Sequence, residues 1–143
     1  MSNINNTSTD DLMDMYELNF LTTFNIIKPI YKWMKDQGGG RIVVTGAKPA
    51  EEGNAADVLP YALAKRSVMH LAEILNETGK SDQIVVSSII PSIIDTPPNR
   101  EAMPNANFGD WVSPEEIAGN IMHLISREAR AIRQPIIKIY GNS

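Results

Sequence analysis

The sequence predicts an α/β fold, with a three-stranded parallel sheet flanked by helices. Segments with helical periodicity alternate along the chain with short apolar segments, and these apolar segments are continuous rather than alternating. Strands that are apolar on both faces are typical of a parallel sheet covered by helices on each side. The 143 residues, 43% hydrophobic and 21% charged, are enough for one globular domain with its own core.

The first helix is predicted over residues 11–36, after a polar leader at 1–10 that we expect to be flexible. Apolar residues recur in this helix at spacings of three and four, as a single buried face requires. Pro29 lies inside the pattern and predicts a kink or a break there. The three glycines at 38–40 are expected to end the helix.

Two strands and a second helix follow. Residues 41–45 (RIVVT) are short, β-branched and preceded by glycine, so they predict a buried strand, and 46–57 are expected to form a loop. The second helix is predicted over 58–78, with Gly79 as its C-terminal stop. The second strand is predicted over 83–90 (QIVVSSII).

The last part of the chain is predicted to contain a loop, a helix and a strand. The loop covers 95–107 and is rich in proline and asparagine. The helix covers 113–126, because Ser113 and Glu116 have the spacing of a capping box and a proline stands between them at the first helical position. The third strand is predicted over 135–141.

Composition excludes several classes of function. The 13 Lys and Arg against 17 Asp and Glu give a net charge of −4, which argues against nucleic acid as a partner. The absence of cysteine excludes disulfides, thiolate metal sites and a cysteine nucleophile. The two histidines, His70 and His123, have no ligand spacing, so no metal site is expected. No apolar segment approaches the ~18 residues of a membrane span, and we expect a cytoplasmic protein without a membrane partner.

The segment YALAK carries the sharpest chemical signal. Tyr61 and Lys65 are four residues apart in a predicted helix, which places both side chains on one face. A free tyrosine has a pKa near ~10, and a nearby ammonium group lowers it, so the pair is suited to proton transfer. A surface lysine beside a half-buried tyrosine is the alternative interpretation of the same spacing.

The surrounding motifs resemble the short-chain dehydrogenase/reductase family over nearly the whole chain. Asn19 lies in ELNFLTTF, GGGRIVVTGA ends the strand before Tyr61, and PSIIDTPPNR follows the next strand. The resemblance implies the C-terminal part of a Rossmann-like parallel sheet. It implies NAD or NADP as the cofactor, with a small-molecule substrate. By resemblance the catalytic residues are Asn19, Tyr61 and Lys65.

The same resemblance implies a role for each of these residues. Tyr61 would donate the proton, Lys65 would hold the ribose hydroxyls and lower the pKa of Tyr61, and Asn19 would position a water molecule. The nicotinamide end of the cofactor would contact Lys65, Pro91, Ile93, Ile94 and Thr96.

Two segments look like dihydropteridine-reductase-type members and their bacterial relatives: GAKPA, and the stretch from Asp95 to Trp111. In this comparison Ala47 stands where the family places a catalytic serine, which leaves Tyr61 alone to polarise the carbonyl. This favours an easily reduced substrate such as a quinonoid pterin. The substrate pocket would then be lined by Ala47, Phe108 and Trp111. Packing against the start of the following helix is the alternative role for the two aromatic residues.

The family's N-terminal strand and glycine-rich turn, which cradle the pyrophosphate, have no counterpart in this sequence. We therefore expect residues 11–143 to be a partial domain lacking the dinucleotide-binding half, with weak or absent cofactor binding. Two functions stay open: an incomplete reductase, or a non-catalytic remnant that serves as a dimerisation or interaction module. In either case the resemblance implies a homo-oligomer formed through helices 11–36 and 58–78.

Overall fold

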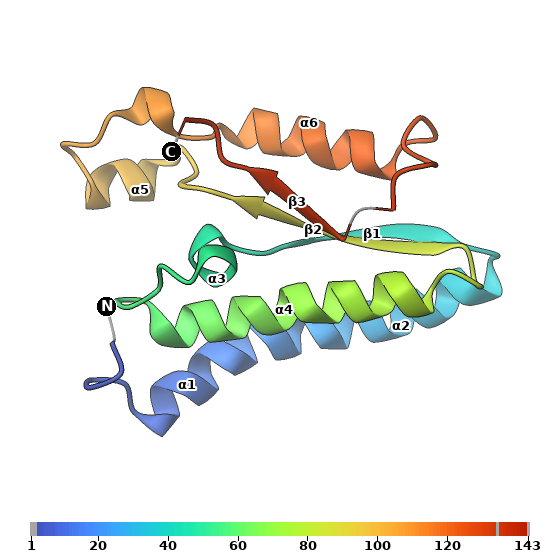
Figure 1. Cartoon of the computed structure of the whole chain (residues 1–143), viewed down its shortest axis with the longest axis horizontal. Helices are drawn as coiled ribbons and strands as arrows, with labels where there is room; N and C mark the ends of the chain where they lie inside the picture. Colours follow the sequence, from blue (N-terminus) through green and yellow to red (C-terminus); the bar gives the residue numbers. More distant parts are fainter. Residues whose placement is uncertain (1–2, 134, 143) are drawn as a thin grey trace.

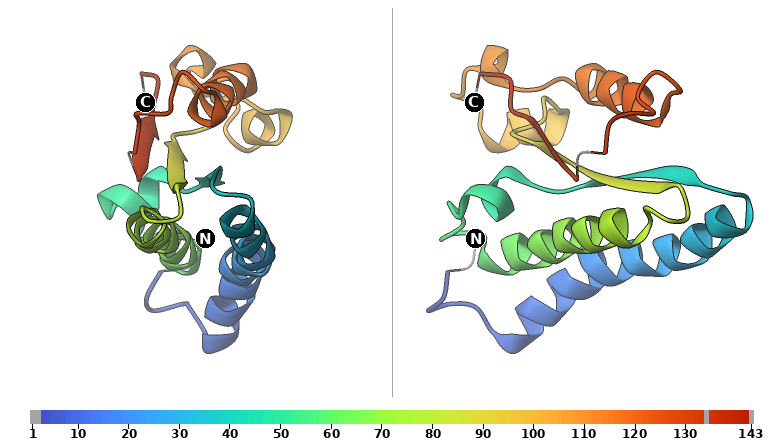
Figure 2. Two further views of the ribbon diagram at one scale, coloured as in Figure 1. Left: turned by 90° about the vertical axis from the view of Figure 1, so that its right-hand side faces the viewer. Right: turned by 45° about the vertical axis from the view of Figure 1, so that its right-hand side comes forward.

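The fold is a three-layer α/β arrangement in a computed structural model that describes residues 3–133 and 135–142. Strands β1 (Gly40–Thr45), β2 (Ile84–Pro91) and β3 (Ile136–Ile139) form a parallel sheet in the order β1-β2-β3. Seen end-on, helices lie on both faces of the sheet (Figure 2). The predicted α/β class and the parallel, helix-covered sheet are confirmed.

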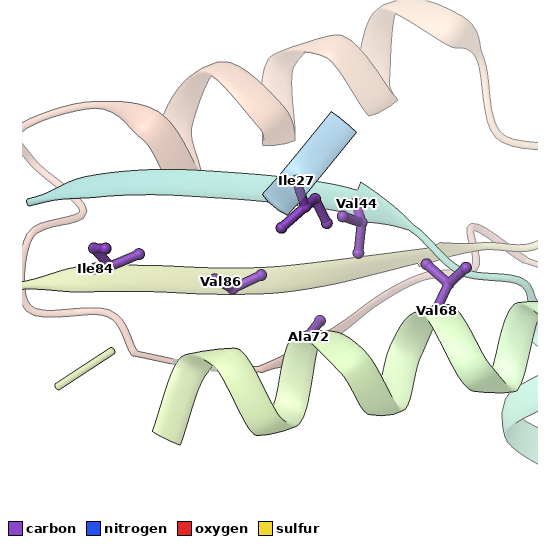
Figure 3. Packing of buried hydrophobic residues seen from close by; sticks show 6 residues of the cluster. All are labelled: Ile27, Val44, Val68, Ala72, Ile84 and Val86. Carbon is purple, nitrogen blue, oxygen red and sulfur yellow. The ribbon is translucent and has the colours of Figure 1, made fainter. Parts of the chain in front are cut away.

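The helices alternate with these strands along the chain (Figure 1). The long helices α2 (Thr22–Asp36) and α4 (Leu59–Thr78) cover one face of the sheet, and α6 (Pro114–Ile125) covers the other. Between α2, α4 and the sheet lies the main apolar core (Figure 3). Its buried members are Ile27, Val44, Val68, Ala72, Ile84 and Val86.

The first predicted helix is three consecutive segments. It begins as α1 (Thr9–Tyr16), two residues earlier than expected, because Ser8 caps it and forms a reciprocal capping box with Asp11. One π-helical turn, η1 (Glu17–Leu21), then joins α1 to α2. The irregular segment of this helix is therefore the π-helical turn, which lies about ten residues before Pro29.

The break predicted at Pro29 is wrong, because α2 continues through this residue to Asp36. A proline in a helix removes one backbone donor and leaves one carbonyl without its intrahelical bond. Pro29 and Asn25, whose carbonyl loses that bond, are both exposed, so water can satisfy the carbonyl. On the opposite side of the helix, Ile27 is buried in the core and anchors α2 to the sheet.

Two loops predicted from sequence contain short helices instead. The segment 46–57 includes α3 (Lys48–Glu52), and the segment 95–107 includes α5 (Pro97–Ala102). Both helices carry proline in their first turn, where its missing N–H costs nothing. The predicted capping box of α6 is confirmed, and Gly79 caps α4 as expected. Within the described ranges, no helix is long and apolar enough to cross a membrane.

Arg133 ties the segment before β3 to the centre of the fold. Its Nη1 donates to the carbonyl of Asn76 at 2.8 Å and to that of Ile84 at 2.9 Å. Asn76 is buried, and its Oδ1 accepts from the backbone N–H of Val86. One guanidinium group thus satisfies carbonyls of α4 and of β2 that are otherwise shielded from water.

Arg133→Met is expected to lower the free energy of unfolding by about 1–3 kcal/mol, because these buried carbonyls lose a charged donor. Chemical denaturation followed by circular dichroism measures the change. Arg130→Met is the matched control, since Arg130 is exposed and donates no side-chain hydrogen bond to any residue that the structure describes. Equal denaturation midpoints for the two variants would contradict this structural role for Arg133.

Candidate active site

A cavity of about 510 Å³ opens at the carboxyl ends of β1 and β2, between α3, α5 and the start of α4. In open parallel sheets, ligands bind at this edge, where loops after the strands converge. Figure 1 shows α3 and α5 at this end of the sheet. The lining residues are Thr45, Gly46, Ala47, Lys48, Pro49, Glu52, Asn54, Tyr61, Lys65, Pro91, Ser92, Ile93, Ile94, Asn99 and Met103.

Tyr61 and Lys65 both line this cavity and lie one turn apart in α4. The Lys65 Nζ is 5.8 Å from the centroid of the Tyr61 ring, so the two side chains share one face of the helix, as their spacing predicts. The same Nζ donates a hydrogen bond of 3.2 Å to the backbone carbonyl of Thr45 at the end of β1. The ammonium group is thereby held between α4 and the sheet.

Burial determines the protonation of this pair. It raises the pKa of Tyr61 and lowers the pKa of Lys65, because a partly desolvated site disfavours the charged form of each group. The expectation that Lys65 lowers the pKa of Tyr61 is therefore wrong for this structure. With its ammonium group bonded to Thr45 and several ångströms from the ring, Lys65 does not outweigh desolvation. Tyr61 stays protonated at neutral pH, which is the state of a proton donor.

Asn19 lies in η1 and does not line the cavity. Its Nδ2 donates to the backbone carbonyl of Met15 in α1 at 3.0 Å, across the start of the π-helical turn. Met15 and Tyr61 line a smaller cavity of about 240 Å³ between α1 and α4. Asn19 therefore contacts a residue, Met15, that shares a cavity with Tyr61. A π-helical turn in an otherwise regular helix is frequent at functional sites.

The wall formed by the end of β2 contains most of the predicted cofactor contacts. Pro91, Ile93 and Ile94 line the cavity, whereas Thr96 lies just beyond it as the N-cap residue of α5. Asn99 of α5 donates from Nδ2 to the carbonyl of Ile94 at 2.8 Å and fixes α5 against this wall.

The two aromatic residues predicted to line the substrate pocket lie outside the cavity lining. Phe108 and Trp111 pack against each other with ring centroids 4.8 Å apart, and Trp111 is buried. The Arg100 guanidinium lies 4.7 Å from the Phe108 ring centroid and pairs with Asp95, with 2.7 Å between Nη2 and Oδ2. These contacts hold the segment after α5 together beside the site.

Ala47 is buried in the cavity wall, as predicted, and brings a methyl group where the family comparison places a hydroxyl. The sequence did not predict the lining residues of α3, of α5 and of the segments just after these helices: Lys48, Pro49, Glu52, Asn54, Asn99 and Met103. A usable signal existed for Lys48, which follows Ala47 directly. Across the residues described, no group of acidic or histidine side chains could hold a metal ion.

Comparison with known proteins agrees with this geometry. A protein-family profile described as short chain dehydrogenase matches residues 1–107. The acetoacetyl-CoA reductase of Rhizobium meliloti is 29% identical over 132 residues, covering 86% of this chain and 54% of that protein. The dihydropteridine reductase of Dictyostelium discoideum is 34% identical over 82 residues, covering 56% of this chain and 35% of that protein. The chain thus spans about half, or less, of the length of these relatives.

Solved structures share the fold. The gluconate 5-dehydrogenase of Burkholderia cenocepacia, solved with NADP and tartrate, matches with a TM-score of 0.85 and 20% identity, covering 98% of this chain and 58% of its own. A 3-oxoacyl-[acyl-carrier protein] reductase from Brucella melitensis with bound NAD matches with a TM-score of 0.85 and 22% identity, covering 99% and 55%. Together with the profile match and the Tyr61–Lys65 cavity, these similarities establish that the chain belongs to the short-chain dehydrogenase/reductase family of oxidoreductases.

Proposed function

We propose that this chain is the proton-donor and substrate-binding part of a nicotinamide-dependent reductase that acts on a carbonyl or quinonoid compound. The observation that carries the proposal is the placement of Tyr61 and Lys65 in one cavity at the carboxyl ends of the parallel strands. The family membership supports the reaction class. This chain spans only 54% and 35% of the length of the two relatives. We therefore propose the complete activity for a protein that also contains the rest of the domain.

The cavity fits the nicotinamide end of the cofactor. Pro91, Ile93 and Ile94 offer apolar surface to a flat ring, and Lys65 brings a cation to the same cavity, whose hydrogen bonds ribose hydroxyls would accept. Thr96 is the N-cap residue of α5, shortly after this segment, and we assign to it the contact with the carboxamide. When bound, the cofactor supplies a hydride to the carbonyl carbon.

Tyr61 completes the reduction by transferring its hydroxyl proton to the carbonyl oxygen. Burial raises the pKa of Tyr61 and so keeps this proton in place until negative charge develops on that oxygen. Lys65, held by the Thr45 carbonyl, keeps a positive charge beside the resulting phenolate. We assign to Asn19 the ordering of a water molecule near Tyr61, since the π-helical turn that carries Asn19 contacts α4.

The Ala47 methyl group favours substrates that need little polarisation. With no hydroxyl at this position, Tyr61 is the single hydroxyl donor that we assign to the substrate oxygen. A conjugated quinonoid compound accepts a hydride more readily than an isolated ketone. The similarity to the dihydropteridine reductase supports this class of substrate.

The isolated 143-residue chain is expected to bind NADPH weakly or undetectably, because the residues that we assign to the cofactor contact only its nicotinamide end. Calorimetry measures this binding. The matched protein is a chimaera in which the chain replaces the corresponding part of the Rhizobium meliloti acetoacetyl-CoA reductase. It is expected to bind NADPH and to oxidise it when a quinonoid pterin is supplied as the hydride acceptor. Micromolar affinity for NADPH, or turnover, in the isolated chain would contradict the assignment of only the nicotinamide end of the cofactor to these residues. A folded chimaera that binds NADPH without oxidising it would contradict the proposed function.

A second candidate function is a dimerisation module, and exposed apolar side chains favour it. On α1, η1 and α2 these are Met13, Leu18, Phe24, Ile26, Ile30 and Trp33, and on α4 they are Leu63 and Ile74. Exposed apolar residues gathered on neighbouring helices are typical of a protein interface. This function and the reductase are compatible, since a homo-oligomer can present the same cavity.

A further inference from the structure

We propose that Lys48 is a substrate-specificity residue that binds an anionic oxygen group of the substrate, so that the site selects carbonyl compounds bearing a carboxylate. This inference rests on the proposed reductase function and narrows its substrate class. Lys48 is the first residue of α3 and lines the same cavity as Tyr61 and Lys65. The two lysines bring two positive charges to one cavity, against one negative charge from Glu52.

The ammonium group of Lys48 keeps its hydrogen-bond donors available. It lies 4.8 Å from the centroid of the Tyr140 ring, immediately after β3. No hydrogen bond or ion pair joins Lys48 to any other residue in the ranges 3–133 and 135–142. A cation on an aromatic face is held in place by electrostatic attraction without using its N–H groups. An ammonium group in this state can donate to an acceptor that enters the cavity.

Neither neighbouring carboxylate forms an ion pair with Lys48 in the part of the chain that the structure describes. Glu51 pairs with Arg66 at 2.8 Å and with Lys138 at 3.4 Å. Glu52 also lines the cavity and lies beside Tyr140, and burial together with this carboxylate raises the pKa of Tyr140 to about 12. With two lysines against this one carboxylate, the lining side chains keep a net positive charge for a ligand.

The other lining groups set the shape of such a ligand. Part of the lining is apolar, with Pro49, Ile93, Ile94 and Met103. Tyr61 belongs to the same lining and is a donor for the carbonyl oxygen. A compound with a carbonyl at one end and an anionic group a few atoms away therefore meets a donor at each end.

Lys138 is a matched control for Lys48. Its Nζ lies 5.6 Å from the same Tyr140 ring, but it pairs with Glu51 and does not line the cavity. Lys48→Met and Lys138→Met remove the same charge from the same ring, and only the first removes a cavity donor. The thermal midpoint of each variant checks that the fold is kept.

The test is methyl NMR of the isoleucine-labelled full chain, without cofactor, titrated with 4-oxopentanoate or its neutral methyl ester. Ile93 and Ile94 line the cavity and report binding. We expect the carboxylate to shift these methyl signals with about tenfold higher affinity than the ester. Lys48→Met is expected to reduce the carboxylate affinity to that of the ester, while Lys138→Met leaves it unchanged.

Three results would overturn the role of Lys48: equal affinities for the carboxylate and the ester, unchanged carboxylate binding by Lys48→Met, or an equal loss in Lys138→Met. A failure of the carboxylate to shift the two isoleucines would overturn it as well. The titration needs neither cofactor nor turnover. If the chimaera did not oxidise NADPH, carboxylate binding at Lys48 would still be tested by the titration. If Lys48 did not bind the carboxylate, the reductase function would still be tested by the chimaera.

Discussion

Tyr61→Phe is expected to lower NADPH oxidation by the chimaera by about 100-fold to 10,000-fold, the usual contribution of a positioned general acid. The substitution keeps the ring that packs in α4 and deletes only the hydroxyl, so the cavity wall is preserved. Steady-state turnover, with cofactor affinity measured separately, shows whether the loss lies in the chemical step. The cofactor affinity should change little, because we assign no cofactor contact to this hydroxyl.

The control is Tyr31→Phe, in which the same atom is removed from a tyrosine packed against the core on α2. This variant should retain its turnover. If Tyr61→Phe kept more than about a tenth of the turnover, or if Tyr31→Phe lost as much, Tyr61 would not be the proton donor. The cavity would then need another assignment.

The 143-residue chain is expected to form a dimer or larger species at micromolar concentration. Leu63 on α4 and Met13 on α1 border a groove between these helices, and both are about half exposed, at 51% and 49%. Burying such side chains against a second copy is favourable, and a two-fold axis brings the same helices of both copies together. Light scattering measures the mass in solution.

Leu63→Glu is expected to weaken this association by about tenfold or more, since it places a charge in the apolar contact. Met122→Glu is the control, because Met122 is 64% exposed on α6, at the other face of the sheet. A wild-type chain that stays a cooperative monomer of 15.8 kDa would contradict the predicted homo-oligomer and the partial-domain interpretation. Equal weakening by both variants would move the interface away from α1 and α4.

A second route to association lies at the edge of the sheet. Within the described chain β1 pairs only with β2 and so lies at an edge of the sheet, and β1 carries no charge after Arg41. Such a strand offers unpaired backbone groups to another chain. Association that survives Leu63→Glu and disappears with proline in β1, for example Val43→Pro, would identify this edge as the contact.

Much of the fold could be predicted because its signals are local and repeated. Continuous apolar runs mark β1 and β2, and the Ser113–Glu116 capping box marks the start of α6. The short helices α3 and α5 have five and six residues and no buried side chain. Their sequences therefore contain no apolar periodicity from which a helix could be predicted. The π-helical turn adds a single residue to a helix, and its effect on phase is within the variation of ordinary spacing.

The part of the site that could be predicted is the pair of residues contained in one short motif. Tyr61 and Lys65 share a helix, so their spacing alone places them on one face. Phe108 and Trp111 pack together outside the cavity lining, and their sequence alone does not decide this, because two aromatic residues in a loop satisfy each other as readily as they line a pocket. The direction of the Tyr61 pKa shift depends on burial and on the Thr45 carbonyl that holds Lys65, and neither is visible in a spacing.

The parallel sheet also has a kinetic consequence. Gly40 pairs with Ile84, and Ser88 pairs with Ile136, so no strand can find its neighbour through a hairpin. Each pairing waits for a whole intervening helix, and loop closure over such distances slows the search for native contacts. During synthesis, β1 leaves the ribosome well before its only partner in the described chain. This apolar strand is therefore the segment most in need of a chaperone while the rest of the chain is made.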